Sequence, residues 1–250
     1  MAYGLAAFAF APGLALGSFL NVVAARVPLR RSLVSPGSAC MTCGHEIGWR
    51  DNIPVVSWLL LRGHCRQCKA TIPWRYPAVE LTSALLVACC ALKFGLHPDT
   101  LVASFFCLVL VAISATDIEY GIIPNRIVLP AAVIILAAQT TLHPSPQWIV
   151  GAAAAAGFLF AFALIAPRGM GMGDVKLALV LGAMLGSTVA VGMFVGLLAA
   201  MVPAIILFIR FGVGARKVKL PFGPFLALGS IVALFAGHEL LQGYWTLVHH

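Results

Sequence analysis

Residues 191–209 have the sequence VGMFVGLLAAMVPAIILFI, nineteen residues in a row without a charged side chain. A helix that crosses the hydrocarbon core of a bilayer needs roughly 20 mainly apolar residues. The stretch is therefore long and apolar enough to form a transmembrane helix.

The whole chain has the same character. Of its 250 residues, 61% are hydrophobic and 10% are charged, whereas soluble domains average about 45–50% and about 25%. This composition excludes a soluble globular domain, and it excludes a disordered chain, which would be poor in apolar residues. We expect an all-α polytopic membrane protein with about eight transmembrane helices. The apolar stretches lie at roughly 2–25, 77–94, 100–116, 122–141, 148–166, 175–190, 191–209 and 222–242.

These stretches divide the chain into three parts. Residues 1–25 form the first helix, residues 26–76 a polar insert, and residues 77–250 a core of seven helices. The first stretch is apolar and N-terminal like a secretory signal peptide, but no Lys or Arg precedes it, so we expect a helix that is retained. The sixth and seventh stretches are nearly continuous, and their boundary is expected near Gly192.

The basic residues predict the orientation in the membrane. The chain has a net charge of +8, and with eight spans every Lys and Arg except Lys93 falls on one side of the membrane. The positive-inside rule makes that side cytoplasmic. The insert is then cytoplasmic, both termini lie outside the cytoplasm, and no nucleic-acid partner is expected. The later basic residues on that side are Arg126, Arg168, Lys176, Arg210, Arg216, Lys217 and Lys219.

The insert contains two Cys-x-x-Cys pairs, Cys40 with Cys43 and Cys65 with Cys68. Two such pairs can offer four thiolates to one tetrahedral ion, and structural zinc takes such a set at spacings of this order. An insert of about 50 residues has little core of its own, so a metal would supply much of its folding energy. A cytoplasmic location argues against disulfides, and a redox motif needs only one pair. We expect a small zinc-binding insert.

Two aspartates are predicted at the cytoplasmic ends of their helices. Asp117 ends the third apolar stretch, and Asp174 begins the sixth in Gly171-Met172-Gly173-Asp174. Paired carboxylates suit aspartic proteolysis, in which the ionised group takes a proton from water and the protonated group donates to the scissile carbonyl. Glycines before Asp174 would let a substrate backbone approach closely.

Other roles for these acids stay open at this point. Both aspartates can instead cap helices or pair with Lys176 and Arg126. Glu119 is the alternative to Asp117, although it lies nearer the aqueous loop. Acids within spans also mark ion pathways.

Taken together, these residues resemble the type IV prepilin peptidases, which are bifunctional leader peptidases and N-methyltransferases. The resemblance covers most of the chain. It is carried by the two cysteine pairs and by the segments Gly17–Val23, Arg26–Pro28, Trp49–Leu59, Arg75–Pro77, Val79–Leu81, Asp117 with Ile123–Asn125, Gly171–Asp174 and Leu220–Phe225.

The resemblance implies an activity and assigns residues to it. Its catalytic aspartates fall on Asp117 and Asp174, and its zinc ligands fall on the four cysteines. Members cleave the basic leader of prepilins and pseudopilins after a glycine on the cytoplasmic side of the inner membrane. They then methylate the new N-terminus, usually phenylalanine, with S-adenosylmethionine. Type IV pili and type II secretion are the systems that use such products.

The methyl-donor site is less defined, because no Rossmann-type glycine fingerprint is present. Asn21, Arg75 and Glu80 are expected to contact the cofactor, and support of the fold or an ion pair between Arg75 and Glu80 is the other interpretation. The alternatives to the bifunctional enzyme are a leader peptidase without methyltransferase activity and an ion-coupled transporter. A transporter would place its acids near the bilayer midplane. A non-catalytic scaffold is the third alternative.

Overall fold

The computed structural model describes residues 2–165, 171–212 and 220–248, so Arg168, Arg216, Lys217 and Lys219 lie outside the described residues. The described chain is helical, and its β-structure consists of two isolated bridges within the insert. The helices are α1 (Ala2–Arg26), η1 (Trp49–Asp51), α2 (Val56–Leu60), α3 (Arg75–Phe94), α4 (Pro98–Tyr120), α5 (Asn125–Leu142), α6 (Gln147–Ile165), α7 (Met172–Leu185), η2 (Gly186–Thr188), α8 (Val189–Phe211) and α9 (Gly223–Val248).

The all-α membrane fold is confirmed, with one difference in the count of spans. Among the described residues, seven helical stretches are long and apolar enough to cross a membrane, and one of them is the 40-residue stretch Met172–Phe211. The 3-10 turn η2 divides this stretch into α7 and α8. The division falls at Gly186–Thr188 and not near Gly192, because Gly186 adopts a positive φ of 53° and ends α7. With 14 residues, α7 is shorter than the roughly 20 that a full span requires.

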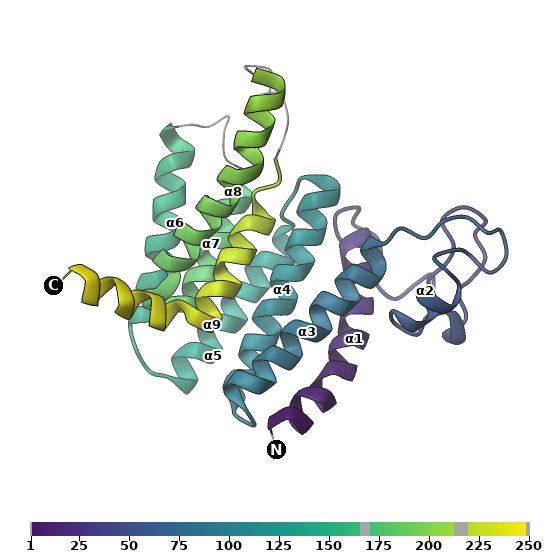
Figure 1. Cartoon of the computed structure of the whole chain (residues 1–250), viewed down its shortest axis with the longest axis horizontal. Coiled ribbons are helices and arrows are strands. Elements are labelled where there is room, and N and C mark those ends of the chain that lie inside the picture. Colours follow the sequence, from purple (N-terminus) through teal and green to yellow (C-terminus); the bar gives the residue numbers. More distant parts are fainter. Residues whose placement is uncertain (1, 166–170, 213–219, 249–250) are drawn as a thin grey trace. The chain divides into compact units, whose positions relative to one another are not determined.

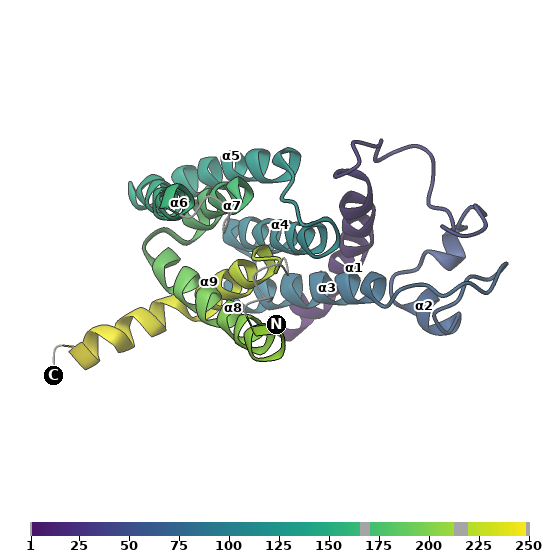
Figure 2. The ribbon, with the colours of Figure 1, turned by 90° about the horizontal axis from the view of Figure 1, so that it is seen from above.

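The chain forms two compact units, residues 1–115 and 116–250. In the first unit, α1 and α3 lie side by side (Figures 1 and 2). Their backbones approach closely at Gly13 and Gly17, where an added Cβ would come within 2.7 Å of the Cα atoms of Ala84 and Glu80 respectively. Small residues at such crossings are how membrane helices pack, since lipid offers no hydrophobic drive to bring helices together.

In the second unit, α7 is the central helix. Most of its side chains are buried, and it packs against α5, α6 and α9. Figure 2 shows α6 and α7 next to each other, and α8 next to α9. An added Cβ at Gly151 of α6 would lie within 3 Å of the carbonyl oxygens of Gly182 and Gly186. Gly151 of α6 and Gly182 of α7 therefore serve helix packing, and this packing fixes the helix that carries Asp174.

Candidate active site and metal centre

Asp117 lies in the last turn of α4, near the start of the second unit. Its side chain is buried, with 7% exposed. Its Oδ2 atom accepts a hydrogen bond from the backbone N–H of Gly223, at 2.8 Å. Gly223 is the first residue of α9, where backbone N–H groups have no partner within the helix. The start of α9 therefore holds one oxygen of Asp117 in place.

Asp174 is the third residue of α7 and is also buried, with 9% exposed. Its Oδ2 atom accepts a hydrogen bond from the N–H of Gly171 at 3.2 Å, and its own N–H donates to the Gly171 carbonyl at 3.1 Å. This reciprocal pair caps the helix, as acidic residues in a first turn commonly do. The positive end of the helix dipole favours the ionised form of the carboxyl group.

The two carboxyl groups lie within electrostatic reach of each other. Three helix ends meet around them, because Gly223 joins α9 to the end of α4 and Ile123 joins the loop after α4 to the start of α7. With one oxygen of each carboxyl group held by a backbone N–H, the second oxygen can accept a hydrogen bond from water or, when protonated, donate one to a peptide carbonyl. Glu119, the alternative to Asp117, is exposed.

The residues around Asp174 have partners within the chain. An added Cβ at Gly173 would lie 3.0 Å from the Cβ of Ile123, so this glycine makes room for the α4–α5 loop. Gly171 is exposed and has no such close neighbour outside its own turn. The Nζ of Lys176 donates to Oδ1 of Asn125 at 3.0 Å, a contact that ties α7 to the start of α5.

The four cysteines of the insert form one cluster. Their sulfur atoms all lie within 4.8 Å of one another, and the Sγ atoms of Cys40 and Cys68 are 3.7 Å apart. Tetrahedral zinc with Zn–S bonds of about 2.3 Å separates its sulfurs by about 3.8 Å. The donor set and its spacing therefore fit a zinc ion. The backbone N–H groups of Cys43 and Thr42 lower the pKa of the Cys40 thiol to about 6. At Cys68 the backbone N–H of Ala70 acts in the same direction, but burial and the neighbouring thiols outweigh it and raise the pKa to about 11. A metal bound by all four cysteines would displace the remaining thiol protons.

The two cysteine loops repeat one backbone pattern. In each, the residue after the second cysteine has a positive φ, 70° at Gly44 and 59° at Lys69. An antiparallel bridge then closes each loop in the same register, Ala39 with Glu46 and His64 with Thr71. We call these two loops the knuckles, residues 39–46 and 64–71. Their equivalence means that each presents two sulfurs in the same way.

An ion pair joins the second knuckle to the rest of the insert. Arg66 binds both oxygens of Asp51 in η1, with its shortest contact at 2.6 Å. The hydrogen bond and then the charge of Arg66 hold the pKa of Asp51 below its usual range. Bidentate geometry of this kind fixes orientation as well as position.

The residues expected to contact the methyl donor lie together at the crossing of α1 and α3. Asn21 donates to the Tyr76 carbonyl at 3.1 Å, and Arg75 lies over the Tyr76 ring, 5.0 Å from its centre. Oε2 of Glu80 accepts the N–H of Val55 at 2.7 Å. Each of them binds the chain itself, which fits support of the fold.

The roles of several residues in these sites cannot be predicted from the sequence. Gly223 is 106 positions from Asp117, and nothing local marks a backbone N–H as a carboxylate partner. Lys69 occupies a position where glycine is usual, and only its match to Gly44 in spacing from the cysteines could have identified it. Asn125 and Tyr76 lie in segments that carry the family resemblance, but only the fold shows their hydrogen-bond partners.

Comparison with known proteins identifies the family. Residues 12–94 match the bacterial peptidase A24 N-terminal domain, and residues 104–209 match the type IV leader peptidase family. A prepilin leader peptidase/N-methyltransferase of Bacillus subtilis (strain 168) is 36% identical over 93% of this chain and 94% of its own length. Proteins of the same name from Burkholderia pseudomallei (strain 1026b) and Aeromonas salmonicida (strain A449) are 35% and 33% identical. They align over 92% and 94% of this chain and over 85% and 92% of their own lengths.

No solved structure gives a significant match. The relatives align with this chain over most of their lengths. The N-terminal domain matches the part of the chain that holds the four cysteines, and the leader peptidase family matches the part that holds both aspartates. The chain therefore belongs to the type IV leader peptidase family, as an enzyme whose relatives are named for both proteolysis and N-methylation.

Proposed function

We propose that this protein is a membrane aspartic endopeptidase that removes the leader of type IV prepilins and pseudopilins and then methylates the new N-terminus. Cleavage follows a glycine on the cytoplasmic side of the inner membrane, and the methylated residue is usually phenylalanine. The names of the relatives support both activities.

The observation that carries the proteolytic activity is the meeting of Asp117 and Asp174 at three helix ends. Two carboxyl groups at close range resist double ionisation, so the pair shares one proton. The ionised member takes a proton from water as the water attacks the scissile carbonyl. The protonated member donates to the carbonyl oxygen. The resulting pKa values belong to the pair and not to either residue.

The dipole of α7 favours the ionised form of Asp174, and we assign the shared proton to the pair and not to one of the two carboxyl groups. Gly171 remains exposed beside Asp174, which leaves room for a substrate backbone. Lys176 and Asn125 act as positioning residues, because their hydrogen bond fixes the first turn of α7.

The insert would hold one structural zinc ion through Cys40, Cys43, Cys65 and Cys68. This ion would link the two knuckles to each other, and we assign no catalytic step to it. Methylation requires S-adenosylmethionine, and Asn21, Arg75 and Glu80 are the residues we propose nearest to its site. We place the insert and both aspartates on the cytoplasmic side of the inner membrane and both termini outside the cytoplasm.

Cleavage of a prepilin by reconstituted protein tests the proteolytic assignment. Asp117→Asn and Asp174→Asn should each lower the rate by about 10²–10⁴-fold, which is the usual contribution of a general acid or base. Glu119→Gln is the matched control and should cleave at nearly the normal rate. A folded aspartate variant with near-normal activity contradicts the assignment.

The mass of the product tests methylation in the same experiment. With S-adenosylmethionine present, the cleaved pilin should gain one methyl group at its N-terminus, and without it the product should be unmodified. Complete cleavage with no methyl group under either condition would leave a leader peptidase that does not methylate.

A further inference from the structure

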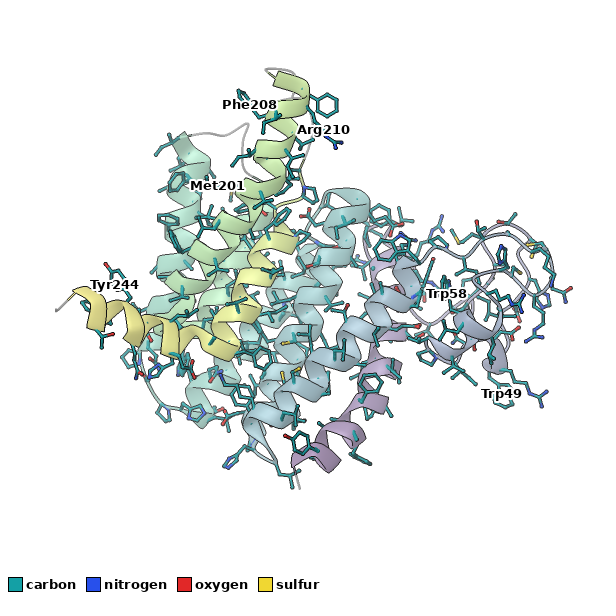
Figure 3. The ribbon with its side chains drawn as sticks, viewed as in Figure 1. Trp49, Trp58, Met201, Phe208, Arg210 and Tyr244 are labelled. Carbon is teal, nitrogen blue, oxygen red and sulfur yellow. The ribbon has the colours of Figure 1, made fainter. Side chains whose placement is uncertain are left out.

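The insert exposes an apolar face on α2 and the neighbouring turn η1. On α2, Val56, Leu59 and Leu60 are 46%, 61% and 78% exposed, and their spacing places them on one side of the helix. Trp49 in η1 is 75% exposed, and in Figure 3 it lies at the outer edge of the insert. We call these four residues the apolar face of the insert.

The two elements that carry this face are joined to each other. Ser57 is buried on the opposite side of α2. Its hydroxyl donates to the Arg50 carbonyl at 2.9 Å and accepts the N–H of Ile53 at 3.0 Å. Trp49 is therefore held beside α2, and the exposed side chains belong to one structured surface and not to separate loose loops.

The same surface is fixed beside the start of a membrane-spanning helix. Val55, which precedes α2, donates its N–H to Glu80 at 2.7 Å. Glu80 is five residues into α3, or about 7.5 Å along its axis. Trp58 also donates to the Ile72 carbonyl at 3.0 Å, and Figure 3 shows Trp58 near the first turn of α3. The start of α2 therefore lies beside the second turn of α3, near the end at which this membrane-spanning helix begins.

The charge of the insert indicates which kind of partner covers its apolar face. Residues 26–75 contain eight Lys and Arg against two acids, Glu46 and Asp51, a net charge of +6. The Arg50 guanidinium lies 5.2 Å from the centre of the Trp49 ring. Apolar and aromatic side chains flanked by cations are typical of segments that lie in the interface of an anionic bilayer. A second copy of this insert would bring like charges together.

We propose that the apolar face of the insert rests in the headgroup region of anionic lipid, with Trp49, Leu59 and Leu60 inserted and Arg50 paired with lipid phosphate. The contact adds a second attachment of the insert to the bilayer, besides the ends of α1 and α3. It is independent of the proteolytic assignment, since it concerns neither aspartate.

Fluorescence quenching by lipid tests the proposal on the full-length protein. The protein is reconstituted into vesicles of phosphatidylglycerol and phosphatidylcholine whose acyl chains carry bromine near the headgroup. The signal of Trp49 is taken as the difference between the normal protein and Trp49→Phe. We expect the brominated mixed vesicles to quench most of the Trp49 fluorescence. Brominated vesicles of phosphatidylcholine alone should quench less of it.

A pair of variants separates docking from folding. Leu59→Gln with Leu60→Gln should restore much of the Trp49 signal, while Met41→Gln should not change it. Met41 is the matched control because it is 90% exposed and apolar but lies in the first knuckle. Unchanged zinc content shows that both variants keep the insert folded.

Other outcomes overturn the proposal. Trp49 that is unquenched by brominated lipid but open to a water-soluble quencher would show that the face is free in water. Trp49 that is protected from both quenchers only at high protein density would show a second copy on the face. Protection that appears only when a prepilin is added would show a substrate there.

Discussion

Each of the two aspartates is held through one oxygen by a backbone N–H from a glycine. Gly223 holds Asp117 and Gly171 holds Asp174. A backbone donor keeps its direction more firmly than a side chain does, because it has no rotamers to sample. At a site that works by positioning, displacements near 1 Å can cost about 10²-fold in rate. These two glycines are therefore part of the machinery that orients the carboxyl groups.

Gly223 provides a direct test of this role. In Gly223→Ala the added Cβ would lie 2.8 Å from Oδ2 of Asp117, so the carboxyl group must move. We expect prepilin cleavage to fall by about tenfold to 10²-fold, with the helical content unchanged by circular dichroism. Gly243→Ala in the same helix is the control, because its Cβ would meet nothing within 4 Å. Equal activity in the two variants would contradict the orienting role.

At the residue scale, the candidate site could be predicted because charged residues are rare in this chain. With eight acids in the chain, those at helix ends stand out, and the structure brings Asp117 and Asp174 within electrostatic reach. Their hydrogen-bond partners were not predictable, because a backbone N–H from a distant helix has no signature in side-chain identity. The same holds for Val55 and Glu80, which are 25 residues apart.

Among the elements, the two knuckles depend least on side-chain packing for their stability. They have isolated bridges in place of strands and little apolar core, so bound metal is expected to provide much of their folding energy. Purified protein should contain one zinc ion per chain. Cys43→Ser should lose it, and amide hydrogen exchange should rise over residues 39–71. Cys89→Ser is the control, because Cys89 is exposed on α3 and should leave the zinc content unchanged.

The close packing of α6 on α7 leads to a second testable prediction about the helices. In Gly151→Ala the new Cβ would lie within 3 Å of backbone atoms of Gly182 and Gly186, which cannot move aside as a side chain can. Overpacking of this kind costs about 1–3 kcal/mol, and the loss should appear as earlier thermal unfolding in detergent. Gly157→Ala on the same helix meets open space and should be neutral or slightly stabilising.

Most elements follow from hydropathy alone, and the exceptions have physical causes. The apolar stretches predicted each long helix, with the largest differences at the ends of α7 (Met172–Leu185) and α9 (Gly223–Val248), which were expected at residues 190 and 242. The division between α7 and α8 was misplaced because the whole stretch is apolar, and a turn inside it depends on Gly186 adopting a positive φ. The cysteine spacing predicted the cluster, whereas the matching turn at Lys69 could not be recognised from residue type.

For the whole molecule, the number of crossings decides the side on which the chain ends. If η2 reverses the chain so that α7 and α8 cross separately, eight crossings place both termini outside the cytoplasm. If Met172–Phe211 crosses once, the C-terminus is cytoplasmic. We expect a reporter that is active only outside the cytoplasm to work when fused after residue 250. The same reporter placed in the insert, between residues 34 and 35, should be inactive. An inactive C-terminal fusion with an intact chain would show seven crossings.

The equivalence of the two knuckles has a consequence for how the protein responds to its surroundings. Each knuckle supplies half of the sulfur ligands, so an ion held by one knuckle alone gains only part of the binding energy, and the two become ordered together. Stabilisation by a bound ion grows with the logarithm of its free concentration above the dissociation constant. If the insert binds the proposed zinc ion, it should therefore change from disordered to ordered as free zinc rises through the dissociation constant of the ion. A cell starved of zinc would lose the insert as a unit, while the aspartates in the other half of the chain kept their helices.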